Sequence, residues 1–84
     1  MKEYDRVRLL TAIEGGTVNA PVTIPAGTEG IIVEVYQGGA GYEVDFTLRE
    51  TVFGPDDEVL VRGHYETESV SADKLAPLAP GTGF

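Results

Sequence analysis

The chain contains no cysteine, so it can form neither a disulfide bond nor a thiolate metal site. Its stability must come from packing and from hydrogen bonds within sheets, and a reducing cytoplasm is the expected environment. No apolar run approaches the roughly 20 residues that cross a bilayer, and the first six residues are mostly charged where a signal peptide would be apolar. We therefore expect a cytoplasmic protein with no membrane partner.

Side chains that carry out catalysis are scarce. His64 is the only histidine and Ser69 and Ser71 are the only serines, so no second histidine or cysteine can activate a serine nucleophile. Under strict alternation His64 shares its strand face with Arg62 and Glu66, which is typical of a salt-linked surface histidine. We expect no catalytic residue and hence no enzyme activity.

Cofactor and metal motifs are also missing. Asp56-Asp57-Glu58 supplies too few oxygen ligands for a calcium loop, whose ligands also alternate along the chain, and it is expected to be a solvated turn. Gly38-Gly39-Ala40-Gly41 lies between two strands and lacks the lysine of a phosphate-binding loop. No cofactor and no bound metal are expected.

Acidic residues outnumber basic ones by fourteen to six, which gives a formal net charge of −8. This charge repels phosphate backbones and anionic lipids and attracts a basic protein partner. Nucleic acid is not expected to bind, because the arginines are scattered among carboxylates and form no basic groove. The same charge also keeps a small domain soluble without any partner, so both interpretations stay open.

Hydrophobic residues recur with a period of two nearly everywhere, and no window has the period of a helix. With 84 residues the chain can build only one core. The sequence therefore predicts a single all-β domain. Strands are expected at residues 6–10, 30–37, 42–48, 58–70 and 75–78, the fourth of them bent at Gly63.

Alternation assigns faces to two of these strands, which the glycines of residues 38–41 join into a hairpin. In residues 30–37 it points Ile32, Glu34 and Tyr36 to one side and Ile31, Val33 and Val35 to the other. In residues 42–48 the side chains expected to face inward are Tyr42, Val44, Phe46 and Leu48. In residues 11–24, glycines and a proline predict a long excursion, which Val18, Val22 and Ile24 fold back onto the barrel.

Ser71, the first residue of 71–74, has a hydroxyl group that favours the start of a helix. Pro77 follows closely and prevents a longer helix, so a single 3-10 turn is expected before the last strand. About five strands with such a turn are the components of a small SH3-like β-barrel, whose closure removes exposed sheet edges. The barrel is expected to span residues 1–78, followed by a flexible C-terminal tail at residues 79–84.

Three sequence blocks carry a more specific resemblance: PAGTEGIIVEVY at residues 25–36, YEVDF at residues 42–46 and KLAPL at residues 74–78. Together they resemble a family of small stand-alone bacterial proteins catalogued as a domain of unknown function. More distantly, they are similar to the barrel of nitrile hydratase β-subunits and to the KOW barrels of ribosomal and transcription-elongation proteins. The resemblance implies an SH3-like barrel and no particular activity, since this family has no settled one.

The hairpin of residues 30–48 carries the most informative charges. Alternation places Glu34, Glu43 and Asp45 on its outer face with Tyr36 beside them. A solvated face is the simplest interpretation, and a docking surface for an arginine-rich partner is the functional one. Val52 and Phe53 form a second candidate contact, because an apolar pair in a connection either tucks onto the barrel, the favoured outcome, or meets a partner.

The leading hypothesis is a non-catalytic, acidic protein-binding module that engages a basic protein, as an antitoxin, an immunity protein or an accessory subunit would. The alternative, implied by the nitrile hydratase likeness, is an enzyme-associated barrel that docks on or matures a metalloenzyme. A KOW-like barrel associated with nucleic acid is the third. A toxin-like reading frame beside this one favours the first hypothesis, and a hydratase operon favours the second.

Overall fold

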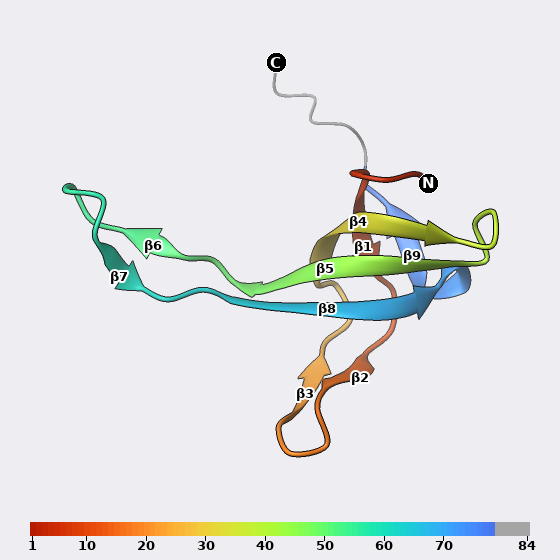
Figure 1. Ribbon diagram of the computed structural model, residues 1–84, viewed down its shortest axis with the longest axis horizontal. Helices are drawn as coiled ribbons and strands as arrows, with labels where there is room; N and C mark the ends of the chain where they lie inside the picture. Colours follow the sequence, from red (N-terminus) through yellow and green to blue (C-terminus); the bar gives the residue numbers. More distant parts are fainter. Residues whose placement is uncertain (79–84) are drawn as a thin grey trace.

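The computed structural model describes residues 1–78, so the expected tail at residues 79–84 lies outside the described residues (Figure 1). The described chain is built from strands and one 3-10 turn. In order these are β1 (Arg6–Leu9), β2 (Ile13–Gly16), β3 (Pro21–Ile24), β4 (Glu29–Tyr36), β5 (Gly41–Arg49), β6 (Val52–Phe53), β7 (Val59–Val61), β8 (His64–Ser71), η1 (Ala72–Lys74) and β9 (Leu75–Pro77).

Five of the strands form one antiparallel sheet in the order β8-β5-β4-β1-β9. Strand β1 pairs with β4 on one side and with β9 on the other, so strands from the two ends of the described chain lie side by side at one edge of the sheet. The turn η1 connects the edge strands β8 and β9, and the Ala72 amide donates to the Ala40 carbonyl. The expected all-β, barrel-like fold with a 3-10 turn before its last strand is confirmed.

The core lies on the concave side of this sheet. Its buried side chains come from six elements: Val7, Leu9, Ile24, Ile32, Tyr42, Val44, Phe46, Val70 and Leu75. Among the described residues no polar or charged side chain is fully buried. The inward alternation expected for Tyr42, Val44 and Phe46 is therefore confirmed, and Leu48 packs partly buried against the same core.

A β-bulge in β4 changes the alternation that the sequence predicts there. The pairing with β5 shifts between Ile32 and Glu34, so Val33 is an extra residue without a partner of its own. Ile32 is consequently fully buried, whereas Glu34 is exposed on the opposite face. The prediction that Ile32 and Glu34 share one side of the strand was wrong, because the bulge adds one residue between them.

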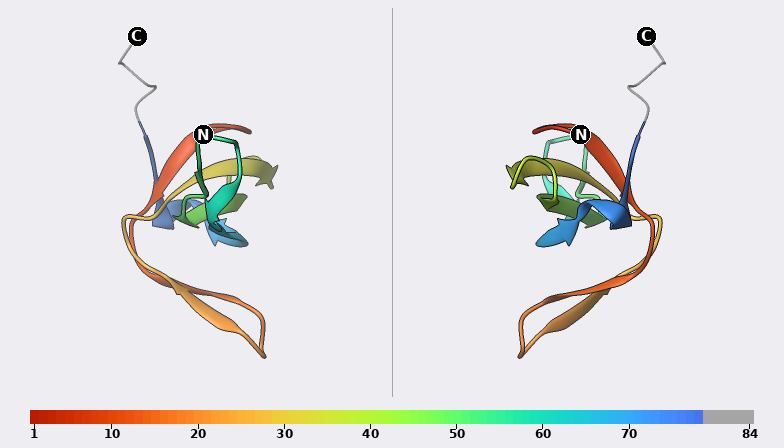
Figure 2. Two further views of the ribbon diagram at one scale, coloured as in Figure 1. Left: turned by 90° about the vertical axis from the view of Figure 1, so that its left-hand side faces the viewer. Right: turned by 90° about the vertical axis from the view of Figure 1, so that its right-hand side faces the viewer.

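Residues 11–24 also differ from the expectation of an excursion that folds back. Strands β2 and β3 pair with each other as a separate two-stranded arm, which leaves the barrel in both views of Figure 2. Ile24 enters the core and Val22 packs partly against it, as expected. Val18 does not, because it lies in the turn at the tip of the arm with 99% of its surface exposed. Gly16 accommodates this turn with a φ of 78°, where a Cβ would meet the Ala20 carbonyl.

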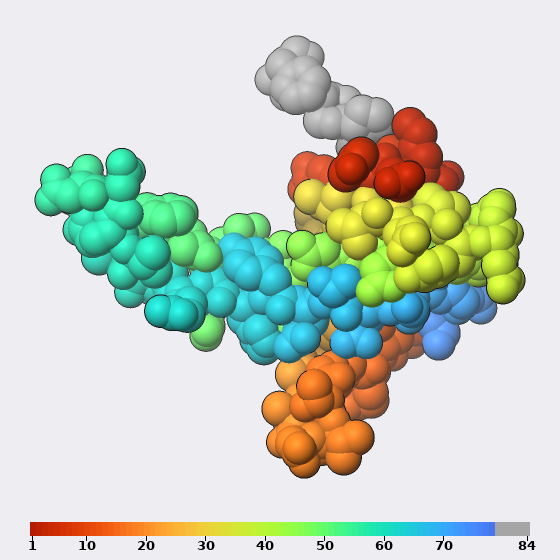
Figure 3. Space-filling view, viewed as in Figure 1, coloured from red at the N-terminus to blue at the C-terminus, as the bar shows by residue number. Residues whose placement is uncertain are grey.

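The predicted fourth strand at residues 58–70 is divided at Arg62 and Gly63. Its first part, β7, pairs with β6 in a second arm, and its second part, β8, pairs with β5 in the barrel. Both arms stand out from the body in the space-filling view (Figure 3). The Cα radius of gyration is 14.1 Å, whereas a compact domain of this length has about 12 Å. The two arms thus make the described chain more extended than a compact domain.

Replacing Phe46 with alanine tests where the stability resides. Because Phe46 is fully buried, the change leaves a cavity and should lower the free energy of unfolding by about 3–5 kcal/mol. The matched control is Phe53→Ala in the exposed arm, which should change it by no more than about 0.5 kcal/mol. Urea denaturation followed by circular dichroism measures both, and equal losses would contradict this assignment of the core.

Candidate functional site

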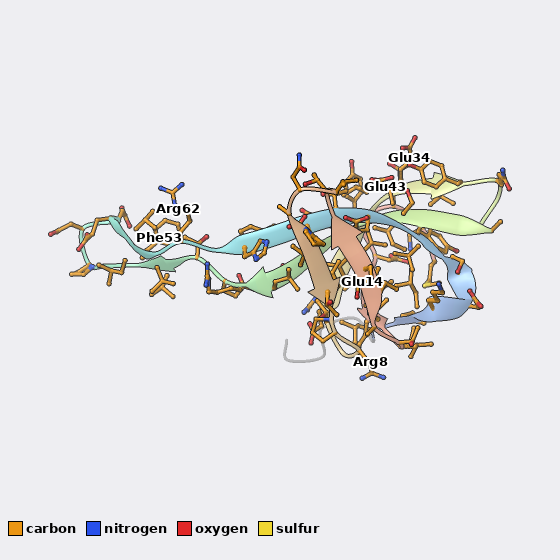
Figure 4. The ribbon with its side chains drawn as sticks, turned by 90° about the horizontal axis from the view of Figure 1, so that it is seen from below. Arg8, Glu14, Glu34, Glu43, Phe53 and Arg62 are labelled. Atoms are coloured by element: carbon orange, nitrogen blue, oxygen red, sulfur yellow. The ribbon has the colours of Figure 1, made fainter. Side chains whose placement is uncertain are left out.

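Four of the six predicted contact residues lie together on the outer face of β4 and β5. We call Glu34, Tyr36, Glu43 and Asp45 the acidic face. Glu34 stands directly opposite Glu43 in the pairing of the two strands, and Figure 4 shows their side chains on the same side of the sheet. The bulge at Val33 and the alternation of β5 together bring these carboxylates to one surface.

Hydroxyl groups hold two of these carboxylates in place. The Tyr36 hydroxyl donates to Glu43 Oε2 at 2.5 Å, and the Ser69 hydroxyl donates to the same oxygen at 3.1 Å. The Thr67 hydroxyl donates to Asp45 Oδ1 at 3.4 Å. Thr67 and Ser69 were not among the predicted site residues, although their alternation along β8 was a signal for the same face. The carboxylates of Glu43 and Asp45 are thus held in a defined orientation.

The electrostatic environment of Tyr36 follows from these contacts. The hydrogen bond to Glu43 is the main cause that raises the pKa of Tyr36 to about 12, and partial desolvation and the charges of Glu43 and Glu34 add to it. The hydroxyl therefore remains a neutral donor throughout the physiological range. Its proton stays on Tyr36 and is donated to the Glu43 carboxylate, which keeps these two side chains of the acidic face ordered.

No cation neutralises the acidic face within the described residues. Their ion pairs join Lys2 to Asp5, Arg6 to Glu29 and His64 to Glu66, all elsewhere. Glu34 instead faces the like charge of Glu43 across the strands, an arrangement that destabilises a sheet. The face consequently combines three carboxylates with an aromatic ring and has no positive charge of its own.

A hollow of about 340 Å³ adjoins one end of the acidic face. Tyr36 and Ser69, both hydrogen-bonded to Glu43, line it together with Tyr42 and Val70. Its walls thus mix aromatic and aliphatic surface with hydroxyl groups. The hollow is open to solvent, and Glu43 lies beside it through its hydrogen bonds to Tyr36 and Ser69.

Val52 and Phe53, the remaining predicted contacts, lie in the arm formed by β6 and β7 and not on the barrel. Val52 is 45% exposed and Phe53 is 60% exposed, so the expectation that they tuck in was wrong. The arm projects away from the barrel, which leaves them no apolar surface to cover (Figure 1). Sequence reasoning missed their exposed neighbours Val59, Leu60 and Val61, whose position across the Gly54–Asp57 turn was a hairpin signal.

The side chains considered for chemistry are engaged in local contacts. His64 Nε2 lies 2.9 Å from Glu66 Oε1, as the salt-linked interpretation expects, and Ser71 donates to Asp73 at 2.6 Å. Arg62 lies in the break between β7 and β8 and not on the strand with His64. In residues 1–78 no three histidine or acidic side chains are grouped to hold a metal ion.

The chain was compared with protein families, curated proteins and solved structures. No family model, no curated protein and no solved structure matches the chain. Over the described residues, no helix is long and apolar enough to span a membrane. Function is therefore inferred from the side chains of the acidic face and the exposed arm.

The Tyr36–Glu43 hydrogen bond gives the site a measurable pH dependence. The pKa of Tyr36 is raised above its ordinary value of about 10. The hydrogen bond therefore contributes fully to stability below pH 10, and this contribution is lost as the pH rises through about 12. In Glu43→Gln the pKa of Tyr36 should fall toward 10. NMR titration of the Tyr36 ring measures it, with Asp45→Asn, which leaves the bonded carboxylate intact, as control. Equal midpoints in the wild type and Glu43→Gln would refute the contact.

Proposed function

We propose that this chain is a non-catalytic protein-binding module of the cytoplasm whose acidic face receives cationic side chains from a protein partner. The roles that fit such a module are those of an antitoxin, an immunity protein or an accessory subunit. The observation that carries the proposal is the pairing of Glu34 with Glu43, on a face where no lysine or arginine of residues 1–78 lies within ion-pair distance.

The unpaired carboxylates have an energetic cost that a cationic partner would remove. Like charges directly opposite each other in a sheet are destabilising. A guanidinium placed between Glu34 and Glu43 would turn this repulsion into two attractions, and the planar donor group of arginine suits adjacent carboxylates. The net charge of −8 would in addition speed the encounter with a basic partner.

The hydroxyl contacts support a binding role. Because Tyr36, Thr67 and Ser69 already orient Glu43 and Asp45, less side-chain freedom is lost when a partner binds. His64, the histidine considered above as a catalytic base, is hydrogen-bonded to Glu66. It lies on the face of β8 opposite to Ser69. This arrangement favours recognition over catalysis.

A defined peptide tests the acidic face directly. A short polyarginine peptide should bind the wild type with an affinity that falls as salt rises, and polyglutamate of the same length should not bind. Glu34→Gln, Glu43→Gln and Asp45→Asn together should abolish most of this binding, because they remove three charges and keep the hydrogen-bond acceptors. The matched control removes three charges from the arm turn by Asp56→Asn, Asp57→Asn and Glu58→Gln. If both triple variants lose binding equally, net charge and not this face is responsible.

The natural partner is sought by pulldown from the native cell. The wild type is compared with a variant in which Glu34, Glu43 and Asp45 are all replaced by lysine. A basic protein should be captured by the wild type and lost with the variant, whereas identical partner sets would rule out this face.

A further inference from the structure

Strand β8 is an edge strand whose backbone is paired on one side only. It stands at one end of the sheet order and pairs with β5 alone, and Figure 2 shows it at the free margin of the curved sheet. Within residues 1–78, no backbone group outside β5 hydrogen-bonds to the backbone of β8. Every second residue of such a strand directs its N–H and C=O groups outward. A row of backbone donors and acceptors is thus available to a further strand.

The other free edges of the described chain are short or interrupted. Strand β9 has three residues and ends in Pro77, which has no N–H group to donate. The strands of the two arms have two to four residues each, and Pro21 begins β3. Strand β8 has eight residues and contains neither proline nor lysine, the residues that commonly protect an edge. It is therefore the edge best suited to receive another strand.

Two carboxylates of the acidic face lean over β8. Glu43 stands opposite Ser69 and Asp45 stands opposite Thr67 in the pairing of β5 with β8. The hydrogen bonds from the Ser69 and Thr67 hydroxyls, at 3.1 and 3.4 Å, hold the carboxylates above these two short side chains. Neighbouring strands lie about 4.8 Å apart. A long basic side chain on an added strand therefore needs to cross only Thr67 or Ser69 to meet a carboxylate.

From this geometry we infer that the cationic partner binds as an extended segment that adds a strand to the free edge of β8, an assignment that rests on the proposed function. The backbone of the segment pairs with β8. Lysine or arginine side chains at alternate positions lie over Thr67 and Ser69, against Asp45 and Glu43. In this mode of recognition the main-chain hydrogen bonds supply affinity and the alternate side chains supply specificity.

The inner side of β8 argues against a second copy as the added strand. Glu66 and Glu68 stand opposite Phe46 and Val44, which are fully buried, so both carboxylates point to the inner side of the sheet. Inward-pointing charges are a known protection against edge-to-edge pairing. A second copy paired antiparallel about Thr67 would place Glu66 opposite Glu68, and like charges in that position are destabilising. A basic segment meets no such repulsion, so the edge selects it over the chain itself.

The β2–β3 arm leaves this edge open. Its contact with β8 is on the inner side, where the Gly16 amide donates to Glu68 Oε2 at 2.9 Å. The approach is so close that a Cβ on Gly15 would lie 2.6 Å from the same carboxylate oxygen. Over residues 1–78 no backbone pairing joins the arm to β8. The arm is thus held by one side chain, and the outward backbone groups of β8 stay accessible.

Backbone methylation of a peptide tests strand addition without changing charge. The probe is a short peptide in which arginine alternates with threonine, made also with every arginine amide or every threonine amide N-methylated. In an extended strand these two sets of amides point to opposite edges, so only one derivative loses its hydrogen bonds to β8. That derivative should bind at least about tenfold more weakly than the other in fluorescence anisotropy. Equal affinities of the two derivatives overturn the inference.

Amide exchange and one pair of variants locate the edge on the protein. The unmethylated peptide should slow hydrogen exchange at alternate amides of β8 and leave those of β9 unchanged, as measured by NMR. Thr67→Lys should weaken peptide binding at least about tenfold, because it places a cation where the peptide's arginine would lie. The matched control is Thr11→Lys, an equal change of charge at an exposed residue outside the strands, with circular dichroism confirming that both variants fold. Equal losses in the two variants, or unchanged exchange in β8, contradict the assignment.

The outcomes separate this inference from the proposed function. A chain that binds polyarginine but does not distinguish the two methylated derivatives loses strand addition and retains a cationic partner. A chain that binds neither polyarginine nor the alternating peptide loses both. Sedimentation velocity addresses the remaining occupant: a wild type that dimerises, and whose dimer is lost in Thr67→Lys, assigns the edge to a second copy and overturns the inference.

Discussion

The rest of the structure depends on the antiparallel pairing of β5 with both β4 and β8. Because neighbours hold its backbone on both sides, each β5 side chain is committed to one of the two faces of the sheet. Val44 and Phe46 are thereby fully buried, and Glu43 and Asp45 are directed to the outer face. A slip of one residue would exchange the two pairs and bring the carboxylates into a dry core, so core packing also fixes the register of the acidic face.

The chain divides its apolar residues between a small core and two projecting arms. Residues 13–24 and 52–61 pair mainly with themselves, although Ile24 is anchored in the core. Stability therefore resides in the barrel, while the arms expose side chains such as Leu60, 60% of whose surface is accessible. This division is compatible with the proposed binding role, because exposed surfaces extend from the body without disturbing the packing that holds it together.

Alternation predicted the faces of β5 well, because this strand follows a strict period of two. It misplaced Ile32 relative to Glu34, since the run Ile31-Ile32-Val33 contains β-branched residues on both faces and no glycine marks the bulge. The four acidic-face residues were nevertheless assigned to one surface, because Glu34 and Tyr36 both follow the bulge and Glu43 and Asp45 alternate along β5. Thr67 and Ser69 were missed because they belong to β8, and their part in the face depends on strand neighbours that the sequence does not show.

The sequence by itself determined the all-β fold, the hairpin over the glycines, the 3-10 turn and the alternation that separates Phe46 from Glu43. These depend on interactions within a few residues, namely side-chain period and turn geometry. Only the tertiary structure decided that Val18 and Phe53 leave the barrel and that, within the part of the chain the structure describes, no cation pairs with Glu34. Those outcomes depend on how distant segments meet, because nine side chains from six elements fill the core and the two arms pair with themselves.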